Sequence, residues 1–229
     1  DLVVFLAAAG DVGLRLTLLP VLYQRGGFDG RPLSARQQRF GHATDAFVRL
    51  VDDLRSAVAG TADVRIGVAF HSLRAVTLPT MRHVLAALDE PGMPVDARWT
   101  LVHATHLDEA EVRGIAASGA TVAICPTTEA NLGDGLFPLR AYLAAGGRYG
   151  IGSDSHVSVS PVEDLRWLEY GQRLVEQKRS RALLGPGSNA ETMLRAVAAA
   201  GAAPTTHPGG RCEATGALDA IVLEGEGTA

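Results

Sequence analysis

The 229-residue sequence lacks the features that identify several large classes of protein. Its two cysteines, Cys125 and Cys212, lie far apart, so they give neither a metal-binding spacing nor a disulfide framework, which fits a reducing cytoplasm. No apolar run is long enough to cross a bilayer, so we expect no membrane contact. The net charge is -4, and the only basic stretch, Arg173–Arg181, is interpreted as a solvated helix face, which disfavours nucleic acid as the main partner.

Short apolar segments alternate with helix-like segments along most of the chain. We predict strands over 14–19, 64–70, 99–102, 121–125 and 148–151, and helices over 1–10, 43–59, 78–88, 108–118, 139–145, 161–184 and 190–200. Apolar strands joined by helices are typical of a parallel sheet with right-handed crossovers. About five such units predict an α/β fold with most of a (β/α)8 barrel, and a doubly wound open sheet is the alternative. No glycine-rich phosphate loop follows any strand, which disfavours the open sheet.

Four successive predicted strands end in polar or ionisable residues. His71 and Arg74 follow the strand over 64–70, and His103 follows the next one. The polar segment 126–135 follows the fourth strand, and Asp154 follows the fifth. Because the carboxyl ends of barrel strands share one rim, these side chains predict a functional site there.

Asp154 has no evident local role, because Ser160, Pro161 and Glu163 already supply a cap for the following helix. It is therefore a candidate metal ligand or acid–base group, and the alternative is a loop aspartate that bonds its own backbone. Imidazole and carboxylate groups both ligate zinc, which activates a bound water near neutral pH. His103 would act beside that water as a base or as an electrophilic partner.

Arg74 is a candidate for binding an acidic substrate, because guanidinium grips a carboxylate with two parallel hydrogen bonds. The alternative is a surface arginine that packs its aliphatic stem. Tyr23 could reach the same rim, although most such tyrosines pack at the edge of a core. His106 is a weaker candidate because Asp108–Glu111 after it resembles a helix cap, and His156 could orient the site or cap a loop.

Several motifs together resemble the formimidoylglutamate deiminases, a family of the amidohydrolase superfamily. They are Leu19–Tyr23, Phe70–Val76, Leu101–His106, Thr128–Gly135, Gly150–His156 and Asp164–Arg173, and they extend over most of residues 10–180. The resemblance implies a zinc-bearing (β/α)8 barrel that hydrolyses N-formimino-L-glutamate to N-formyl-L-glutamate and ammonia, and it also implies a homodimer.

The same resemblance implies roles for five residues. Asp154 matches the family's metal-binding aspartate at the last barrel strand, and His103 matches its catalytic histidine near the metal. Tyr23, His71 and Arg74 match positions expected to bind the glutamate part of the substrate.

The sequence departs from the family at three places. The family's His-x-His metal pair has no counterpart before Asp1, and the strand expected to carry a further metal-ligand histidine and a catalytic glutamate is missing near Val95. The small β-domain is reduced to a predicted strand over 217–224. We therefore expect an incomplete barrel over 1–205 and a remnant of the small domain over 206–229.

Either the sequence omits segments of the real molecule or the molecule is a truncated, inactive relative. The join at Val95 favours the first reading, because losing a barrel strand would expose unpaired edges. The alternative functions are another amidohydrolase, such as a nucleobase or aminopurine deaminase, and an inactive barrel fragment that serves as an interaction module.

Overall fold

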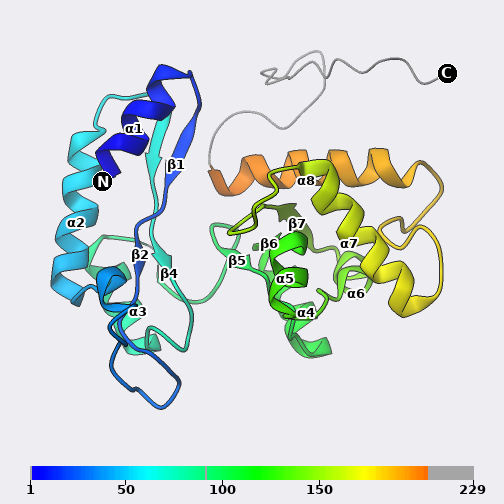
Figure 1. Ribbon diagram of the computed structural model, residues 1–229, viewed down its shortest axis with the longest axis horizontal. Coiled ribbons are helices and arrows are strands. Elements are labelled where there is room, and N and C mark those ends of the chain that lie inside the picture. Colours follow the sequence, from blue (N-terminus) through cyan, green and yellow to red (C-terminus); the bar gives the residue numbers. More distant parts are fainter. Residues whose placement is uncertain (1, 91, 206–229) are drawn as a thin grey trace. The chain divides into compact units, whose positions relative to one another are not determined.

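The computed structural model describes residues 2–90 and 92–205, which form two compact units divided between Pro94 and Val95 (Figure 1). The first unit contains α1 (Leu2–Asp11), β1 (Leu16–Leu18), β2 (Val21–Leu22), the 3-10 helix η1 (Gln38–Phe40), α2 (Thr44–Ala57), β3 (Val64–Ile66), β4 (Ala69–Phe70) and α3 (Leu78–Ala87). The second contains β5 (Thr100–Val102), α4 (Glu109–Ser118), β6 (Thr121–Ile124), α5 (Pro126–Leu132), α6 (Leu139–Ala144), β7 (Arg148–Ile151), α7 (Pro161–Glu176) and α8 (Asn189–Thr205). The strand predicted over 217–224 lies outside the described residues.

The strands of the first unit run parallel in two short pairs, β1 with β3 and β2 with β4. Pro20 separates β1 from β2 because it has no N–H to donate to a ladder. Backbone bonds on either side keep the two pairs in one register: Gly67 N–H donates to the Leu18 carbonyl, and Ala69 N–H donates to the Pro20 carbonyl, both at 3.0 Å. The predicted strand over 64–70 is therefore two strands, and β2 was not predicted as a separate strand.

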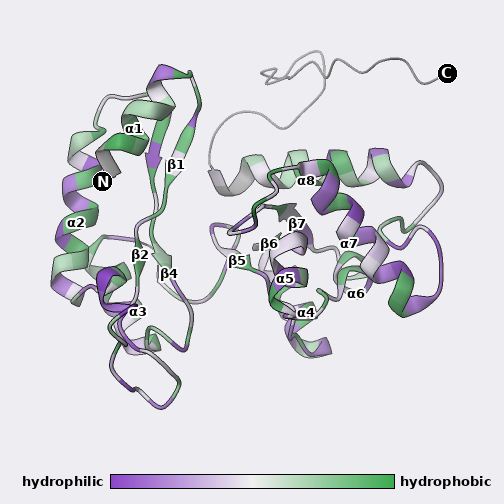
Figure 2. Ribbon diagram, in the orientation of Figure 1, coloured by the Kyte–Doolittle hydropathy of each residue, from purple (hydrophilic) through white to green (hydrophobic). Residues whose placement is uncertain are grey.

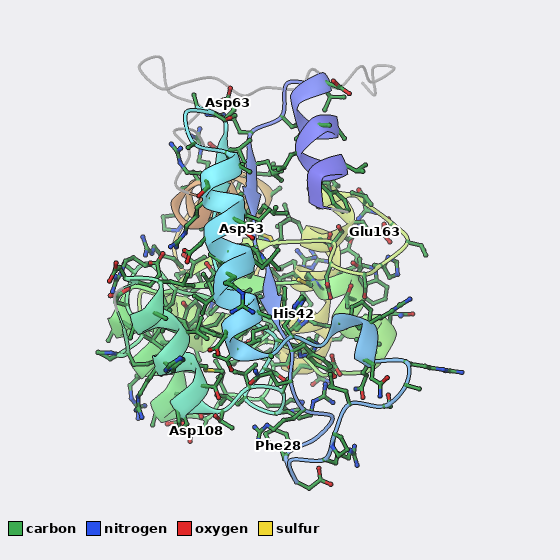
Figure 3. The ribbon with its side chains drawn as sticks, turned by 90° about the vertical axis from the view of Figure 1, so that its left-hand side faces the viewer. Phe28, His42, Asp53, Asp63, Asp108 and Glu163 are labelled. Carbon is green, nitrogen blue, oxygen red and sulfur yellow. The ribbon has the colours of Figure 1, made fainter. Side chains whose placement is uncertain are left out.

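The core of the first unit is covered by α2, whose apolar residues fall on one face. Phe47, Val51 and Leu54 are buried at helical spacing, while Asp53 on the same helix is exposed (Figures 2 and 3). A long loop joins β2 to α2, and Phe28 on it is 80% exposed (Figure 3).

The second unit is built on one parallel sheet with the strand order β5-β6-β7. The helix α4 begins as predicted, because Asp108 and Glu111 form a reciprocal capping box. Tyr142 is fully buried, and its single O–H lies within hydrogen-bond distance of the carbonyls of Ala120 (3.2 Å) and Arg148 (3.1 Å), so α6 is fixed against the ends of two strands.

Two helices differ from the prediction. The helix α5 begins directly after β6, where the sequence predicted only a polar segment. The helix α7 ends at Glu176 rather than near Leu184, because Gln177 adopts φ 53° and the chain turns back. After that turn, the backbone N–H groups of Arg181 and Ala182 both donate to the buried Glu169 carboxylate.

No strand lies between α3 and β5 in residues 88–90 and 92–99, although the family pattern places a strand there. Within the described residues, β4 pairs only with β2, and β5 pairs only with β6. Each therefore has one edge without a partner strand. None of the helices in residues 2–90 and 92–205 combines the length and the hydropathy of a membrane span.

Candidate active site

The second unit brings together His103 at the end of β5 and Asp154 after β7. Nε2 of His103 lies 3.7 Å from Oδ2 of Asp154, which is too long for a hydrogen bond and is an ion pair only when the imidazole is protonated. The two side chains are 33% and 41% exposed, so both can reach a small molecule from solvent. The structure thus supports the predicted convergence of these two strand ends.

The backbone at both residues is in the left-handed region. His103 has φ 66° and Ala104 has φ 52°, and Asp154 has φ 48°. This region disfavours residues with a Cβ and is concentrated at turns and functional sites, where the surrounding structure enforces it. The remaining described non-glycine residues with positive φ are Asp89, Gln177 and Ser180. Positive φ therefore occurs at both predicted catalytic positions, although aspartate and histidine adopt this region more readily than most residues with a Cβ.

A third ionisable group, Glu129 on α5, completes the cluster and was missed as a site residue. Its Oε1 lies 3.1 Å from Nδ1 of His103 and accepts the Cys125 backbone N–H at 2.7 Å. Glu129 is only 3% exposed. Burial raises the pKa of its carboxyl, and the hydrogen bonds from Cys125 and His103 partly offset that effect. The available sequence signal was a glutamate shortly after a proline that directly follows a strand.

His103, Cys125 and Glu129 also form a group whose ligand atoms lie within 4.8 Å of one another. Their existing contacts argue against a metal site. The Glu129 oxygen and the His103 nitrogen are at hydrogen-bond distance from each other, so both atoms are engaged. Burial, followed by the negative charge of Glu129, raises the pKa of the Cys125 thiol to about 12, so the thiol is protonated in the metal-free protein.

The predicted substrate-binding residues lie in the first unit, which is described on its own. The rings of Tyr23 and His71 meet edge to face with centroids 4.4 Å apart. Their neighbouring positions follow from the parallel pairing of β2 with β4, because His71 N–H donates to the Leu22 carbonyl. The Tyr23 hydroxyl is fixed by a 2.7 Å bond from Gln37 Nε2. The structure therefore places two of the three predicted residues in contact.

Arg74 lies near this ring pair with its charge uncompensated. Burial lowers the pKa of His71, and the positive charge of Arg74 lowers it further. Within residues 2–90 and 92–205, the Arg74 side chain has no hydrogen-bond or ion-pair partner. A half-buried guanidinium without a protein partner is available for an external carboxylate.

The two weaker histidine candidates lie outside these clusters. His106 is exposed, and the helix cap after it is present as predicted. Nδ1 of His156 accepts the Ser158 backbone N–H at 3.1 Å, so it caps its own loop.

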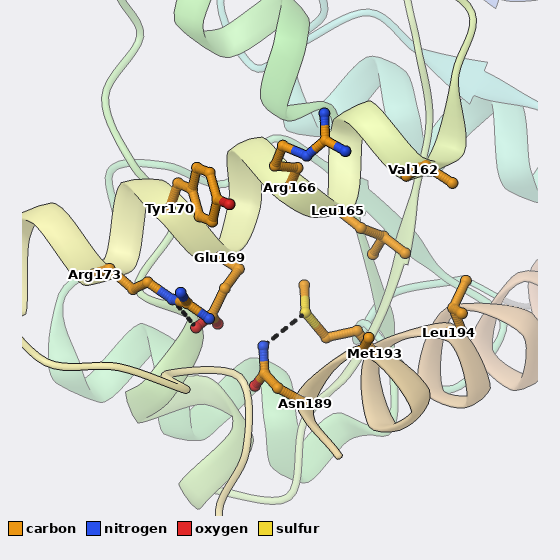
Figure 4. A pocket seen from close by; sticks show the side chains of 10 residues that line it. Val162, Leu165, Arg166, Glu169, Tyr170, Arg173, Asn189, Met193 and Leu194 are labelled. Atoms are coloured by element: carbon orange, nitrogen blue, oxygen red, sulfur yellow. Dashed lines mark hydrogen bonds and ion pairs between the residues drawn. The ribbon is translucent and has the colours of Figure 1, made fainter. Parts of the chain in front are cut away.

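A pocket of about 230 Å³ lies between α7 and α8 (Figure 4). Its lining is mostly apolar and contains none of the predicted site residues. Glu169 faces it, but its carboxylate is already bound by Arg173 (Figure 4). Two backbone N–H groups, those of Arg181 and Ala182, also donate to it. This pocket is therefore separate from the His103 cluster.

The parallel α/β units agree with comparisons to known proteins. The amidohydrolase family model matches residues 83–204, and the chain belongs to that family. A formimidoylglutamate deiminase of Pseudomonas aeruginosa is 43% identical over 255 positions, covering 95% of this chain and 55% of the relative.

Two solved structures are similar to this chain in fold. An amidohydrolase from Brucella melitensis is 35% identical with a TM-score of 0.84, covering 90% of this chain and 53% of that chain. An adenosine deaminase from Xanthomonas campestris, solved with bound zinc, is 20% identical with a TM-score of 0.69, covering 87% of this chain and 50% of that chain, and it supports the fold alone.

The chain spans about half the length of these relatives. The Pseudomonas alignment covers 255 positions, whereas this chain has 229 residues, so that relative contains segments with no counterpart here.

The donors described between residues 95 and 205 do not complete a catalytic zinc site. Such a site takes three protein ligands and leaves one position open. Both nitrogens of His103 face carboxylates, at 3.1 Å and 3.7 Å, which leaves Asp154 as the ligand predicted there. No His-x-His pair occurs in the 229 residues. The described donors of this unit are therefore fewer than such a site requires.

Proposed function

We propose that the protein containing this chain hydrolyses the formimino C–N bond of N-formimino-L-glutamate, giving N-formyl-L-glutamate and ammonia. The observation that carries the proposal is the 43% identity to a formimidoylglutamate deiminase over 95% of the chain. It is supported by the uncompensated Arg74 and by the His103–Asp154 pair at the strand ends. In the reaction, a water oxygen bonds to the formimino carbon, the C–N bond breaks, and the nitrogen leaves as ammonia after protonation.

The proposal assigns His103 and Asp154 to the reacting end of the substrate. Nε2 of His103 would accept and return protons, and Asp154, 3.7 Å away, would hold or move a proton and serve as a metal ligand. Zinc, one ion per subunit, is the proposed metal and would activate the attacking water. Its other ligands are assigned to segments that this chain does not contain.

Tyr23, His71 and Arg74 are proposed to bind the glutamate end. Arg74 would pair with a carboxylate of this acidic small molecule. Burial and the nearby arginine lower the pKa of His71, so it would be neutral at pH 7 and could donate one hydrogen bond and accept another.

We propose that residues 1–205 form an incomplete (β/α)8 barrel that lacks a strand–helix unit near Val95, and that 206–229 are the remnant of the small β-domain. The unpartnered edges of β4 and β5 and the unit boundary at Pro94 support this assignment. A cytoplasmic homodimer is proposed on the family resemblance.

The test is ammonia release by the zinc-loaded protein from its complete reading frame, with N-formimino-L-glutamate and adenosine as parallel substrates. We expect turnover of the first only. Arg74→Ala should raise KM by about 10- to 150-fold, because each hydrogen bond to a charged group contributes about 1.5–3 kcal/mol. Metal content should not change.

Arg49→Ala, an exposed arginine on α2, is the matched control and should leave KM unaltered. Equal turnover of adenosine, or no turnover of either substrate by zinc-loaded protein, would contradict the proposed function. An unchanged KM in Arg74→Ala would contradict only the carboxylate assignment.

A further inference from the structure

The buried carboxylate of Glu129 has no role in the predicted site, yet it lies at hydrogen-bond distance from the His103 ring. Its side chain is 4% exposed, whereas that of His103 is 33% exposed. One oxygen, Oε1, serves two neighbours: the Cys125 backbone N–H at 2.7 Å and Nδ1 of His103 at 3.1 Å. Burying a carboxylate costs free energy, so its position beside His103 indicates a structural or a chemical role.

The direction of the histidine bond follows when Glu129 is ionised. A backbone N–H can only donate, so Oε1 is an acceptor at that contact. An ionised carboxylate has only acceptor sites, and the hydrogen between Glu129 and His103 then belongs to Nδ1. In the neutral imidazole the other nitrogen, Nε2, carries the lone pair. That nitrogen is the one that faces Asp154.

The helix α5, which carries Glu129, is held in place by the two residues that precede Glu129. Thr127 donates from its hydroxyl and its backbone N–H to the buried Asp164 of α7. The Thr128 hydroxyl donates to the Ser153 carbonyl, next to Asp154. Three consecutive residues of α5 thus bind three parts of the unit: Thr127 binds α7, Thr128 binds the segment after β7, and Glu129 binds His103. The position of the carboxylate is determined by this framework.

We propose that Glu129 is a positioning residue that holds His103 in the tautomer protonated at Nδ1, so that Nε2 is the proton acceptor beside Asp154. The catalytic meaning of this assignment rests on the proposed function, but the tautomer itself does not. Hydrogen-bonded carboxylates commonly fix the tautomer of functional histidines through the ring nitrogen remote from the reaction.

The test is a long-range proton–nitrogen NMR correlation of the histidine rings, at a pH where His103 is neutral. The His103 signals are assigned by their loss in His103→Gln. We expect protonated Nδ1 in the unaltered protein. Glu129→Gln should retain it, because the amide oxygen can accept from both Cys125 and His103, whereas Glu129→Ala should lose it.

Glu169→Ala is the matched control, because Glu169 is also 3% exposed and also accepts backbone N–H groups but does not contact His103. It should leave the His103 tautomer unchanged. Protonated Nε2 in the unaltered protein would overturn the proposal even if the alanine variant does not fold. An unchanged tautomer in folded Glu129→Ala, or displacement of the Nδ1 proton by added zinc, would also overturn it.

If the proposed hydrolysis is confirmed, Glu129→Ala should lower kcat by about 10- to 100-fold, the range for residues that orient a functional side chain without contacting the substrate. KM should change little, and Glu129→Gln should recover much of the rate. A missing activity with the expected tautomer would contradict the proposed function and leave the Glu129 assignment intact.

Discussion

Replacing Asp164 by alanine should destabilise the second unit through one buried contact between α5 and α7. Asp164 is 2% exposed, and its Oδ1 accepts the Thr127 hydroxyl at 2.8 Å and the Thr127 backbone N–H at 3.2 Å. Thr127 is itself 3% exposed. The variant would therefore leave two buried donors without a protein partner and without direct access to solvent.

The magnitude follows from these two bonds. A hydrogen bond to a charged group contributes about 1.5–3 kcal/mol, and an orphaned buried donor costs a similar amount. We expect Asp164→Ala to lower the free energy of unfolding by about 3 kcal/mol. For a domain of this size, about 1 kcal/mol corresponds to about 2–4 °C in Tm, so Tm should fall by about 6–12 °C.

The assay is urea unfolding of the single and double variants at Asp164 and Thr127. Asp164→Asn keeps an acceptor oxygen and should lose less stability than Asp164→Ala. Thr127→Val removes one of the two donors, so the double variant should be less destabilised than the sum of the singles, by about 1–2 kcal/mol. A loss below about 0.5 kcal/mol in Asp164→Ala, or strict additivity, would refute the reasoning.

Two further predictions concern Glu169 and Gly147. Burial raises the pKa of Glu169, but hydrogen bonds, first from Arg173, outweigh it and hold the pKa below its usual 4.5. The stabilisation by ionised Glu169 is complete above pH 4.5 and is lost as the pH falls through the lowered pKa of the folded protein. Glu169→Gln should therefore flatten the acid side of a plot of unfolding free energy against pH. An unchanged acid side would exclude a contribution of Glu169 to acid stability. In Gly147→Ala, the new Cβ would lie 2.4–2.5 Å from three ring atoms of the buried Tyr142, which should cost about 1–3 kcal/mol in thermal unfolding. Gly185→Ala, which meets nothing within 4 Å, should be nearly neutral, and equal effects at the two glycines would contradict the packing argument.

Local sequence signals predicted most elements because the deciding contacts are themselves local. The Asp108–Glu111 cap and the Ser160 cap of α7 lie where they were predicted, since each bond joins residues three apart. The end of α7 was mispredicted because it depends on backbone groups beyond the turn reaching back to Glu169. A periodicity argument does not contain that tertiary contact.

The same contrast between local signals and tertiary contacts applies to the candidate site. The proximity of His103 and Asp154 was predicted because strand ends in a parallel sheet meet at one edge. Glu129 was missed because its helix has no side-chain cap at Cys125, and its small polar residues resemble a loop. Its partners, Cys125 N–H and His103, become neighbours only after β5 and β6 pair.

The one-sided strands β4 and β5 have a consequence for handling the isolated chain. Each leaves, within the described residues, a row of amide and carbonyl groups that an extended segment of another molecule can complete. A preparation restricted to these 229 residues should self-associate as its concentration rises. Under the proposed incomplete barrel, a peptide carrying the missing strand would compete for the same edges and keep the chains apart.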